Sequence, residues 1–307
     1  MKVLVFGSNG LVGNSIKRIF TTQNFYTEVF FSTRNDTDLF NYKETNKTIS
    51  KFKPNVIINA AAKVGGIQAN NTDRCNFLIQ NIKINTNILE ACIPDNQIKI
   101  INLGSSCIYP LNAKNPISEN SFMTGKLEPT NSPYAMAKLT AIELGNSLRL
   151  EHGHKVINLM PTNLYGPNDN FSKESSHVIP GLIRRMNDAK LNLDKQFSIW
   201  GSGTPLREFL FVDDLAIAID FILKEDIVDN LINIGSGEEI SILELAKKIK
   251  KVVKYDGNLV FDSSKPDGNP RKLLDSSLIS SYGWKPNTSI DNGLEITFKW
   301  FLTNFNF

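Results

Sequence analysis

A glycine-rich segment near the start of the chain constrains the fold more than any other feature of the sequence. It comes directly after the short apolar run at residues 2–6, and Ile16, Ile19 and Phe20 follow it at helical spacing. Glycines between a strand and a helix let the backbone approach a pyrophosphate, which binds at the positive N-terminus of the helix. The sequence therefore predicts a dinucleotide-binding loop made of Gly7, Ser8, Asn9, Gly10, Leu11, Val12 and Gly13.

Further apolar runs alternate with helical patterns along the chain. Strands are expected at residues 28–31, 55–62, 98–103, 156–160 and 231–234. This alternation predicts an α/β fold with a Rossmann-type doubly wound parallel sheet. From Pro167 onward polar loops dominate the sequence. We therefore expect a dinucleotide-binding domain at 1–166, rejoined by 209–238, and a smaller C-terminal α/β substrate-binding lobe at 167–208 and 239–307, which covers the ligand-binding edge of the sheet.

The composition argues against several classes of protein. A net charge of +3 over 307 residues is too small to indicate a nucleic-acid partner. No stretch reaches the about 18 apolar residues of a membrane span, and residues 3–6 are too short a run for a secretion signal. The three cysteines, Cys75, Cys92 and Cys107, have an odd count and no metal-ligand spacing. We expect no metal site, no membrane contact and a cytoplasmic location.

The end of the second predicted strand bears on the choice of dinucleotide. An acidic residue there would bind the adenosine ribose and indicate NAD. The strand ends instead in Ser32, Thr33 and Arg34. An arginine offers a bidentate partner for a 2′-phosphate, so the sequence favours NADP over NAD. The alternative is that Arg34 is a solvated loop residue.

A tyrosine and a lysine one helical turn apart follow the fourth predicted strand. The helix that starts at Ser132 and Pro133 places Tyr134 and Lys138 on one face. Among the seven tyrosines only Tyr134 has a lysine four residues on. A phenol with a pKa near ~10 is a weak acid–base catalyst, and a neighbouring ammonium together with a cationic nicotinamide would lower that pKa. We expect hydride chemistry here, with Lys138 also bonded to the nicotinamide ribose.

The fourth predicted strand runs into hydroxyls and a thiol. In an extended segment alternate residues share a side, so Ser105 and Cys107 are expected to face one cavity while Ser106 turns away. Ser105 would hydrogen-bond a substrate carbonyl oxygen beside Tyr134. Cys107 has two interpretations on position alone. Its thiol, with an ordinary pKa near ~8.5, either removes a proton next to a ketone or simply fills core space.

His177 and the arginines stand out because both residue types are rare. His177 is one of three histidines and lies in a polar loop of the second lobe, as an acid–base partner for Cys107 or as a surface residue. Eight arginines stand against 26 lysines, so an arginine in a polar segment indicates bidentate binding of a phosphate. Trp200 lies beside glycines, and it either stacks on a base or sugar or belongs to the core.

These residues together resemble the extended short-chain dehydrogenase/reductase family. The similarity runs nearly end to end and includes residues 60–67, 104–110, 134–138 and 200–209. Its most specific parts are residues 104–110 and 176–178, which general members of the family lack. They are similar to the corresponding segments of members that both epimerise and reduce a GDP-linked sugar.

The resemblance implies a two-part reaction at one site. The substrate, GDP-4-keto-6-deoxy-D-mannose, has a C4 ketone that acidifies the protons on C3 and C5. Cys107 and His177 would act as the base and acid that invert these two centres. Tyr134, held by Lys138 and aided by Ser105, would then protonate the C4 oxygen as NADPH delivers a hydride.

The resemblance also implies the ligand contacts and the assembly. The nucleotide sugar would contact Arg185, Trp200, Arg207 and Asp267. The residues that would border NADP are Leu103, Gly104, Ser105, Ser106, Lys138, Pro161, Thr162, Asn163, Leu164 and His177. Some members have a basic residue at the place of Asn9, so here Arg34 must hold the 2′-phosphate alone. A homodimer through the helices that follow the third and fourth strands is the family expectation.

Two alternatives compete with this prediction. One is another NAD(P)-dependent nucleotide-sugar epimerase or dehydratase of the same family. A dehydratase would have a Thr-Asp-Glu cluster in place of residues 105–107, and a 4-epimerase has no use for the thiol. The other is a non-catalytic dinucleotide sensor, which typically loses the tyrosine or the lysine. Both Tyr134 and Lys138 are present here.

Overall fold

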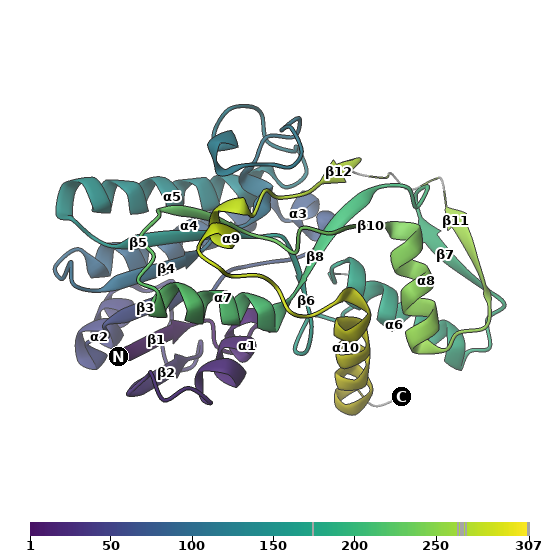
Figure 1. The fold of residues 1–307 in the computed structure, drawn as a ribbon, viewed down its shortest axis with the longest axis horizontal. Coiled ribbons are helices and arrows are strands. Elements are labelled where there is room, and N and C mark those ends of the chain that lie inside the picture. The colour runs from purple at the N-terminus through teal and green to yellow at the C-terminus, as the bar shows by residue number, and fades with distance from the viewer. Residues whose placement is uncertain (174, 263, 265–266, 268, 306–307) are drawn as a thin grey trace.

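The computed structural model describes residues 1–173, 175–262, 264, 267 and 269–305, and Figure 1 shows their arrangement. Residues 174, 263, 265–266, 268 and 306–307, all within the expected second lobe, lie outside the described residues. A parallel sheet with helices on both faces forms one half of the molecule, and smaller sheets with their own helices form the other. The predicted α/β class and Rossmann-type sheet are confirmed.

Six parallel strands make the large sheet, in the order β2-β1-β3-β4-β5-β9. Their bounds are β1 (Lys2–Phe6), β2 (Glu28–Ser32), β3 (Val56–Asn59), β4 (Lys99–Leu103), β5 (Val156–Pro161) and β9 (Leu231–Ile234). Chain order reverses between β1 and β3, which is the switch point where doubly wound sheets bind ligands. The predicted strands agree with these bounds, except that β3 ends at Asn59 because its partner on β1, Phe6, is the last residue of that strand.

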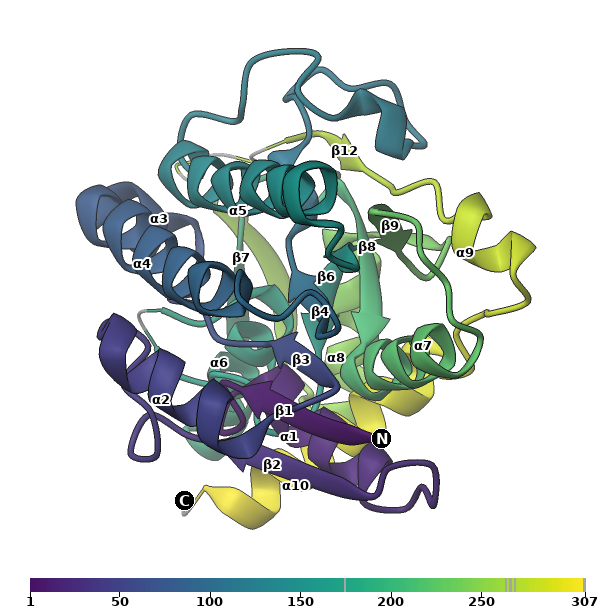
Figure 2. The ribbon, with the colours of Figure 1, turned by 90° about the vertical axis from the view of Figure 1, so that its left-hand side faces the viewer.

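Helices cover both faces of the sheet because successive strand residues point to opposite sides. Helices α1 (Leu11–Phe20) and α7 (Val212–Lys224) pack on the face that contains Val3 and Val5. Helices α2 (Tyr42–Phe52), α4 (Arg74–Cys92) and α5 (Ser132–His152) pack on the opposite face, with Leu4 and Phe6. A short helix, α3 (Ile67–Thr72), leads into α4. Figure 2 shows the strands between the two helical layers.

A row of buried asparagines joins three central strands. Asn59, Asn102 and Asn158 lie in register on β3, β4 and β5. The Nδ2 of Asn102 donates to Asn158 at 3.0 Å, and the Nδ2 of Asn59 donates to Asn102 at 3.2 Å and to Asn85 of α4 at 2.9 Å. Because a buried amide without a partner is costly, these bonds fix the register of the strands whose carboxyl ends reach the site.

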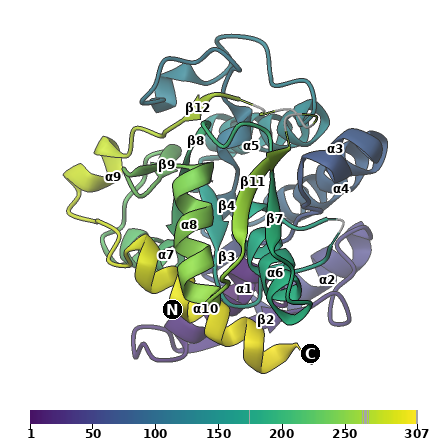
Figure 3. The same cartoon turned by 90° about the vertical axis from the view of Figure 1, so that its right-hand side faces the viewer.

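The second half of the molecule has its own sheets and its own core (Figure 3). Strand β8 (Leu206–Phe211) pairs with β6 (Asn163–Tyr165), β10 (Glu239–Ser241) and β12 (Arg271–Lys272), and β7 (Gln196–Trp200) pairs with β11 (Asn258–Asp262). The helices here are α6 (Val178–Leu191), α8 (Ile242–Val253) and α10 (Ile290–Asn304). Phe171 stacks on Phe301 of α10 with ring centres 4.7 Å apart, inside an apolar cluster that also includes Ile183 and Ile249.

Short helical segments complete the fold: η1 (Ser106–Ile108), η2 (Glu119–Ser121) and α9 (Ser277–Ser281). Strand β8 leads directly into α7, so the two halves are connected where β8 passes the carboxyl edge of the large sheet. Within the described ranges, none of the helices has the length and apolar character to cross a membrane.

Candidate active site

The glycine loop packs tightly between β1, β3 and α1. Gly7 has a φ of +79°, and a Cβ at this position would collide with the backbone of Ala60 and Ala61. A Cβ at Gly13 would collide with the carbonyl of Gly7 and the backbone of Ser8. Helix α1 follows Gly10 without a side-chain cap and without an acidic residue in its first turn. Its N-terminal N–H groups and its dipole are therefore free of a competing acceptor from the cap residue.

The side chain of Ser8 also indicates that the glycine loop fits a dinucleotide phosphate. The side chain of Ser8 is only 4% exposed, and its Oγ has no hydrogen-bond partner among the described residues. A buried hydroxyl without a partner is rare, and one beside a helix N-terminus matches a phosphate oxygen. The Ser8 N–H donates to the Ser32 carbonyl at 3.3 Å, which brings the end of β2 to the loop. Arg34 lies two residues after the end of β2 and is exposed, with its guanidinium 5.2 Å from the Phe40 ring centre. It is a cation suited to a 2′-phosphate.

Helix α5 places Tyr134 and Lys138 one turn apart at the carboxyl edge of β4, as predicted. The Nζ of Lys138 lies 5.7 Å from the Tyr134 ring centre. The same Nζ donates to the Leu103 carbonyl at 2.6 Å, although the side chain is only 2% exposed. The edge of Phe77 from α4 packs against the Tyr134 ring, with centres 6.4 Å apart. These contacts fix the position of the phenol.

The predicted lowering of the Tyr134 pKa is wrong for the chain's own residues. Burial raises the pKa of Tyr134, and the neighbouring Cys107 thiol raises it further. Burial also lowers the pKa of Lys138 to about 8. The lysine ammonium donates to the Leu103 carbonyl, and burial decides the direction of the shift of the Tyr134 pKa.

The segment after β4 is not extended. The prediction that Ser105 and Cys107 share a side because they alternate along extended backbone is therefore wrong in its reason. Residues 106–108 form the 3-10 turn η1, and the Oγ of Ser105 accepts the Cys107 N–H at 3.3 Å. A serine cap of this kind competes with extended backbone. The turn still buries Ser106 and leaves Ser105 and Cys107 half-exposed, which is the expected difference in exposure, while their facing one cavity stays a prediction.

The thiol of Cys107 is not core filling, because it is partly accessible and lies among charged groups. Burial raises its pKa, and the positive charges of Lys272 and Lys138 oppose that shift. Lys272 was not among the predicted site residues. It lies on β12 in register with Arg207 on β8, in a polar segment where nothing in its spacing distinguishes it from 25 other lysines.

His177 precedes α6 and is exposed. Its loop contacts the segment between β3 and α3, where the Gly66 N–H donates to the Ser175 carbonyl at 3.2 Å. The surrounding protein lowers the pKa of the imidazole by desolvation. In the described chain no hydrogen bond joins His177 to Cys107, so their pairing as base and acid stays a prediction.

The four residues predicted to bind the nucleotide sugar all lie in the second half of the molecule. The Arg185 guanidinium is 5.3 Å from the Phe197 ring centre and 5.0 Å from that of Trp200. Trp200 is 53% exposed, which excludes the alternative of a core tryptophan. The Asp267 carboxylate accepts the Ser202 N–H at 2.7 Å and lies close enough to Arg207 to act on its charge. Burial lowers the pKa of both Arg185 and Arg207, as expected where anions are bound out of bulk water.

The fold and these side chains define a class of protein. A glycine loop at the switch point of a parallel sheet, with a Tyr–Lys pair on the helix after the fourth strand, is suited to nicotinamide-dependent chemistry at a carbonyl or alcohol. Residues 3–235 match the NAD dependent epimerase/dehydratase family.

Full-length relatives narrow the class. The chain is 47% identical over 303 residues to GDP-L-fucose synthase 1 of Arabidopsis thaliana, covering 99% of this chain and 94% of that protein. It is 43% identical over 312 residues to GDP-L-fucose synthase of Escherichia coli (strain K12), covering 99% and 97%. Its fold is similar to that of a GDP-L-fucose synthetase from Naegleria fowleri bound to NADP, with a TM-score of 0.89, 30% identity and coverage of 99% and 94%. The chain belongs to the NAD dependent epimerase/dehydratase family and, within it, to the GDP-L-fucose synthases.

Gly10→Ala tests the glycine loop as a phosphate site. Gly10 has a φ of −78°, and a Cβ there would meet only the Gly7 carbonyl, at 3.5 Å. The substitution is therefore expected to change the melting temperature by no more than about 3 °C and to weaken NADPH binding by about tenfold or more. Gly13→Ala should lower both the melting temperature and the affinity for NADPH, because its Cβ collides with the loop itself. Unchanged affinity in Gly10→Ala, measured by fluorescence titration, would contradict the site.

Lys138→Met tests the cost of burying the lysine. The pKa of Lys138 falls from 10.5 to about 8 in the folded chain, so stability present above pH 10.5 is lost as the pH falls through about 8. Methionine removes that dependence, and the variant should be more stable at pH 7 by on the order of 2 kcal/mol, after loss of the bond to Leu103. The gain should shrink towards pH 10.5. Urea unfolding across this range measures it, with Lys126→Met at an exposed position as the control.

Proposed function

We propose that this chain converts GDP-4-keto-6-deoxy-D-mannose to GDP-L-fucose, by epimerisation at C3 and C5 followed by NADPH-dependent reduction of the C4 ketone. The observation that carries this proposal is the accessible Cys107 thiol beside Tyr134 and Lys138. Reduction alone needs the tyrosine and the lysine, whereas inversion at carbon needs a group that removes a proton. The thiol supplies that group, and the synthase relatives support the choice of substrate.

The reductive half of the reaction uses the Tyr134 phenol as a proton donor. NADPH supplies the hydride to C4. Tyr134 gives its proton to the C4 oxygen, and Ser105 donates a hydrogen bond to the same oxygen. Lys138, bonded to the Leu103 carbonyl, is in place to hold the nicotinamide ribose and to restore the proton of the phenol.

The residues that hold the dinucleotide line the carboxyl edge of the sheet. We infer that the glycine loop and Arg34 bind its phosphates. The loop contributes Gly7, Ser8, Asn9, Gly10, Leu11, Val12 and Gly13. The remaining borders of the site come from the ends of β4 and β5 and from the start of α6: Leu103, Gly104, Ser105, Ser106, Pro161, Thr162, Asn163, Leu164 and His177.

The epimerising half uses Cys107 and His177. The C4 ketone acidifies the protons on C3 and C5, because the resulting negative charge is delocalised onto the ketone oxygen. Cys107 and His177 remove and return these protons. The charges of Lys272 and Lys138 favour the thiolate that this step requires. The lowered pKa of His177 favours the neutral imidazole, which can accept a proton at neutral pH.

The substrate-binding lobe, at 167–208 and 239–307, supplies the cations for the diphosphate. We infer that Arg185 and Arg207 contact the phosphates, that Trp200 stacks on the base or ribose and that Asp267 accepts from a sugar hydroxyl. The domain at 1–166, rejoined by 209–238, carries the dinucleotide.

The two competing functions are not favoured. Another nucleotide-sugar epimerase or dehydratase would leave Cys107 without a role, and relatives at 43% and 47% identity over the full chain are GDP-L-fucose synthases. A non-catalytic dinucleotide sensor would not need both Tyr134 and Lys138, and both are present.

We also propose a homodimer and a cytoplasmic location. Helices α4 and α5 pack against each other and expose Ile79, Met136 and Leu150, which a second copy of these helices would cover. All three cysteines are free thiols, in keeping with a reducing compartment.

Incubation with GDP-4-keto-6-deoxy-D-mannose and NADPH tests the function directly. The absorbance of NADPH is expected to fall only when the keto sugar is present, and GDP-L-fucose should accumulate in equal amount. NADPH consumption without inversion would leave a simple reductase. No consumption at all would overturn the proposal.

Cys107→Ser separates the two halves of the reaction. In deuterated solvent the variant is expected to lose deuterium incorporation at C3 and C5 by about 100-fold or more, because a serine hydroxyl is a far weaker base than a thiolate. The fold should be unchanged. Cys75→Ser, at an exposed cysteine, should exchange like the unaltered chain. Normal exchange in Cys107→Ser would remove Cys107 from the mechanism.

A further inference from the structure

Glu208 is a buried carboxylate without a cationic partner. It lies on β8, next to Arg207, and its side chain is 0% exposed. An ion pair between Arg271 of β12 and Glu239 of β10 crosses the same strand. None of the ion pairs among described residues includes Glu208. A carboxylate buried in this way is stable only where N–H groups converge on it.

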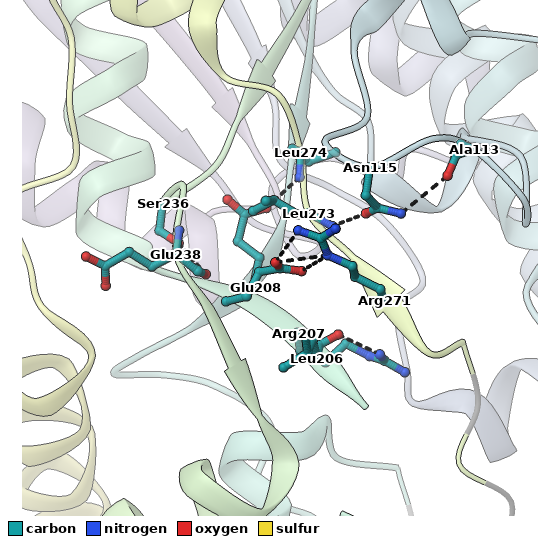
Figure 4. Close-up of polar contacts among 11 residues, drawn as sticks. Ala113, Asn115, Leu206, Arg207, Glu208, Ser236, Glu238, Arg271, Leu273 and Leu274 are labelled. Atoms are coloured by element: carbon teal, nitrogen blue, oxygen red, sulfur yellow. Dashed lines mark hydrogen bonds and ion pairs between the residues drawn. The ribbon is translucent and has the colours of Figure 1, made fainter. Parts of the chain in front are cut away.

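The partners of Glu208 come from three different segments, as Figure 4 shows in part. Its Oε2 accepts the Leu274 N–H at 3.0 Å, and its Oε1 accepts the Gly237 N–H at 2.8 Å. Its backbone carbonyl accepts the Asn163 Nδ2 at 2.8 Å and the Thr162 Oγ1 at 3.2 Å. One residue thus joins β8 to the ends of β5, β9 and β12.

These segments carry the groups that act on the substrate. Lys272 lies two residues before Leu274 and in register with Arg207 on the neighbouring strand. Successive strand residues alternate, so Arg207 points away from the face that Glu208 occupies. The Leu273 N–H, between Lys272 and Leu274, is held by the Asn115 Oδ1 at 2.7 Å. The backbone directly after Lys272 is therefore held at two successive N–H groups.

We propose that Glu208 is a positioning residue, whose carboxylate holds Arg207 and Lys272 in place opposite Cys107 by bonding the backbone after β12 and the turn after β9. This inference deepens the proposed function and rests on it for the identity of the substrate. The carboxylate suits the role because both of its oxygens accept, whereas an amide has one oxygen and would turn its own N–H₂ towards a backbone N–H.

Asp214 offers a matched control for Glu208→Gln. It is a carboxylate 1% exposed on α7, and its oxygens accept the N–H groups of Asn287 and Thr288 at 3.2 and 3.1 Å. Asp214→Asn should therefore disturb an equivalent pair of bonds in a segment that carries none of the substrate cations. Both variants are expected to melt at a lower temperature.

The first measurement is calorimetric binding of GDP, which needs no turnover. Glu208→Gln is expected to bind GDP about fivefold more weakly, while Asp214→Asn keeps the affinity of the unaltered chain. The second measurement is deuterium exchange into the keto sugar, expected to be about tenfold slower in Glu208→Gln. The acid limb of the pH profile of this exchange should move up by about half a pH unit, because a displaced Lys272 stabilises the Cys107 thiolate less. The other titratable groups that face Cys107, Lys138 and Tyr134 of α5, keep their positions in this variant.

The third measurement asks whether Glu208 acts through Lys272. In the Lys272→Ala background, Glu208→Gln should slow exchange by less than about twofold further. Additive losses would overturn the proposal, as would equal effects of Asp214→Asn and Glu208→Gln on GDP affinity. Should Glu208→Gln not fold, Glu208→Asp, one methylene shorter, is measured with the same expectations. If the unaltered chain binds GDP but does not reduce the keto sugar, the proposed function fails, and the GDP measurement alone decides the role of Glu208.

Discussion

The hydrogen bond from the Lys138 ammonium to the Leu103 carbonyl is the interaction on which the rest of the site depends. It joins helix α5 to the last residue of β4 at 2.6 Å, in a place where the lysine is almost fully buried. Because the bond fixes both elements, it sets the phenol of Tyr134 against the turn that carries Ser105 and Cys107. Burial of a cation opposes folding, and the low pKa of Lys138 records that opposition. The chain keeps the lysine where an apolar residue would pack at less cost, as is common at reactive sites.

The large sheet and the glycine loop support this bond with closely packed backbone. The glycines at 7 and 13 let β1, β3 and α1 approach so closely that side chains would collide, and the asparagine row holds β3, β4 and β5 in register. From the second half of the molecule, β8 and β12 contribute Arg207 and Lys272 to the site. Glu208 connects the two sides with bonds to backbone N–H groups rather than to a cation. A buried carboxylate of this kind holds its neighbours only in one geometry, which suits a site that must align two proton transfers and a reduction.

Much of this arrangement follows from local sequence. The apolar runs predicted the strands within a few residues, since a strand buried on both faces has a continuous apolar sequence. The spacing of Tyr134 and Lys138 predicted their common face, because the helical period alone decides it. Two local predictions were wrong. The segment at 105–107, expected to be extended, is a 3-10 turn, because the Ser105 hydroxyl accepts the Cys107 N–H. Among the chain's own residues the Tyr134 pKa rises, because burial disfavours the phenolate.

The sequence by itself determined the doubly wound sheet, the glycine loop and the common helix face of Tyr134 and Lys138, since each depends on residues close together along the chain. Only the tertiary structure decided which distant residues meet. Lys272 reaches Cys107, and Glu208 reaches Gly237 and Leu274, through strand pairings between segments far apart in sequence. A lysine and a glutamate in polar segments have no periodicity that distinguishes them from surface residues. Their importance arises from burial and from the partners that the fold brings to them, and neither is encoded in local spacing.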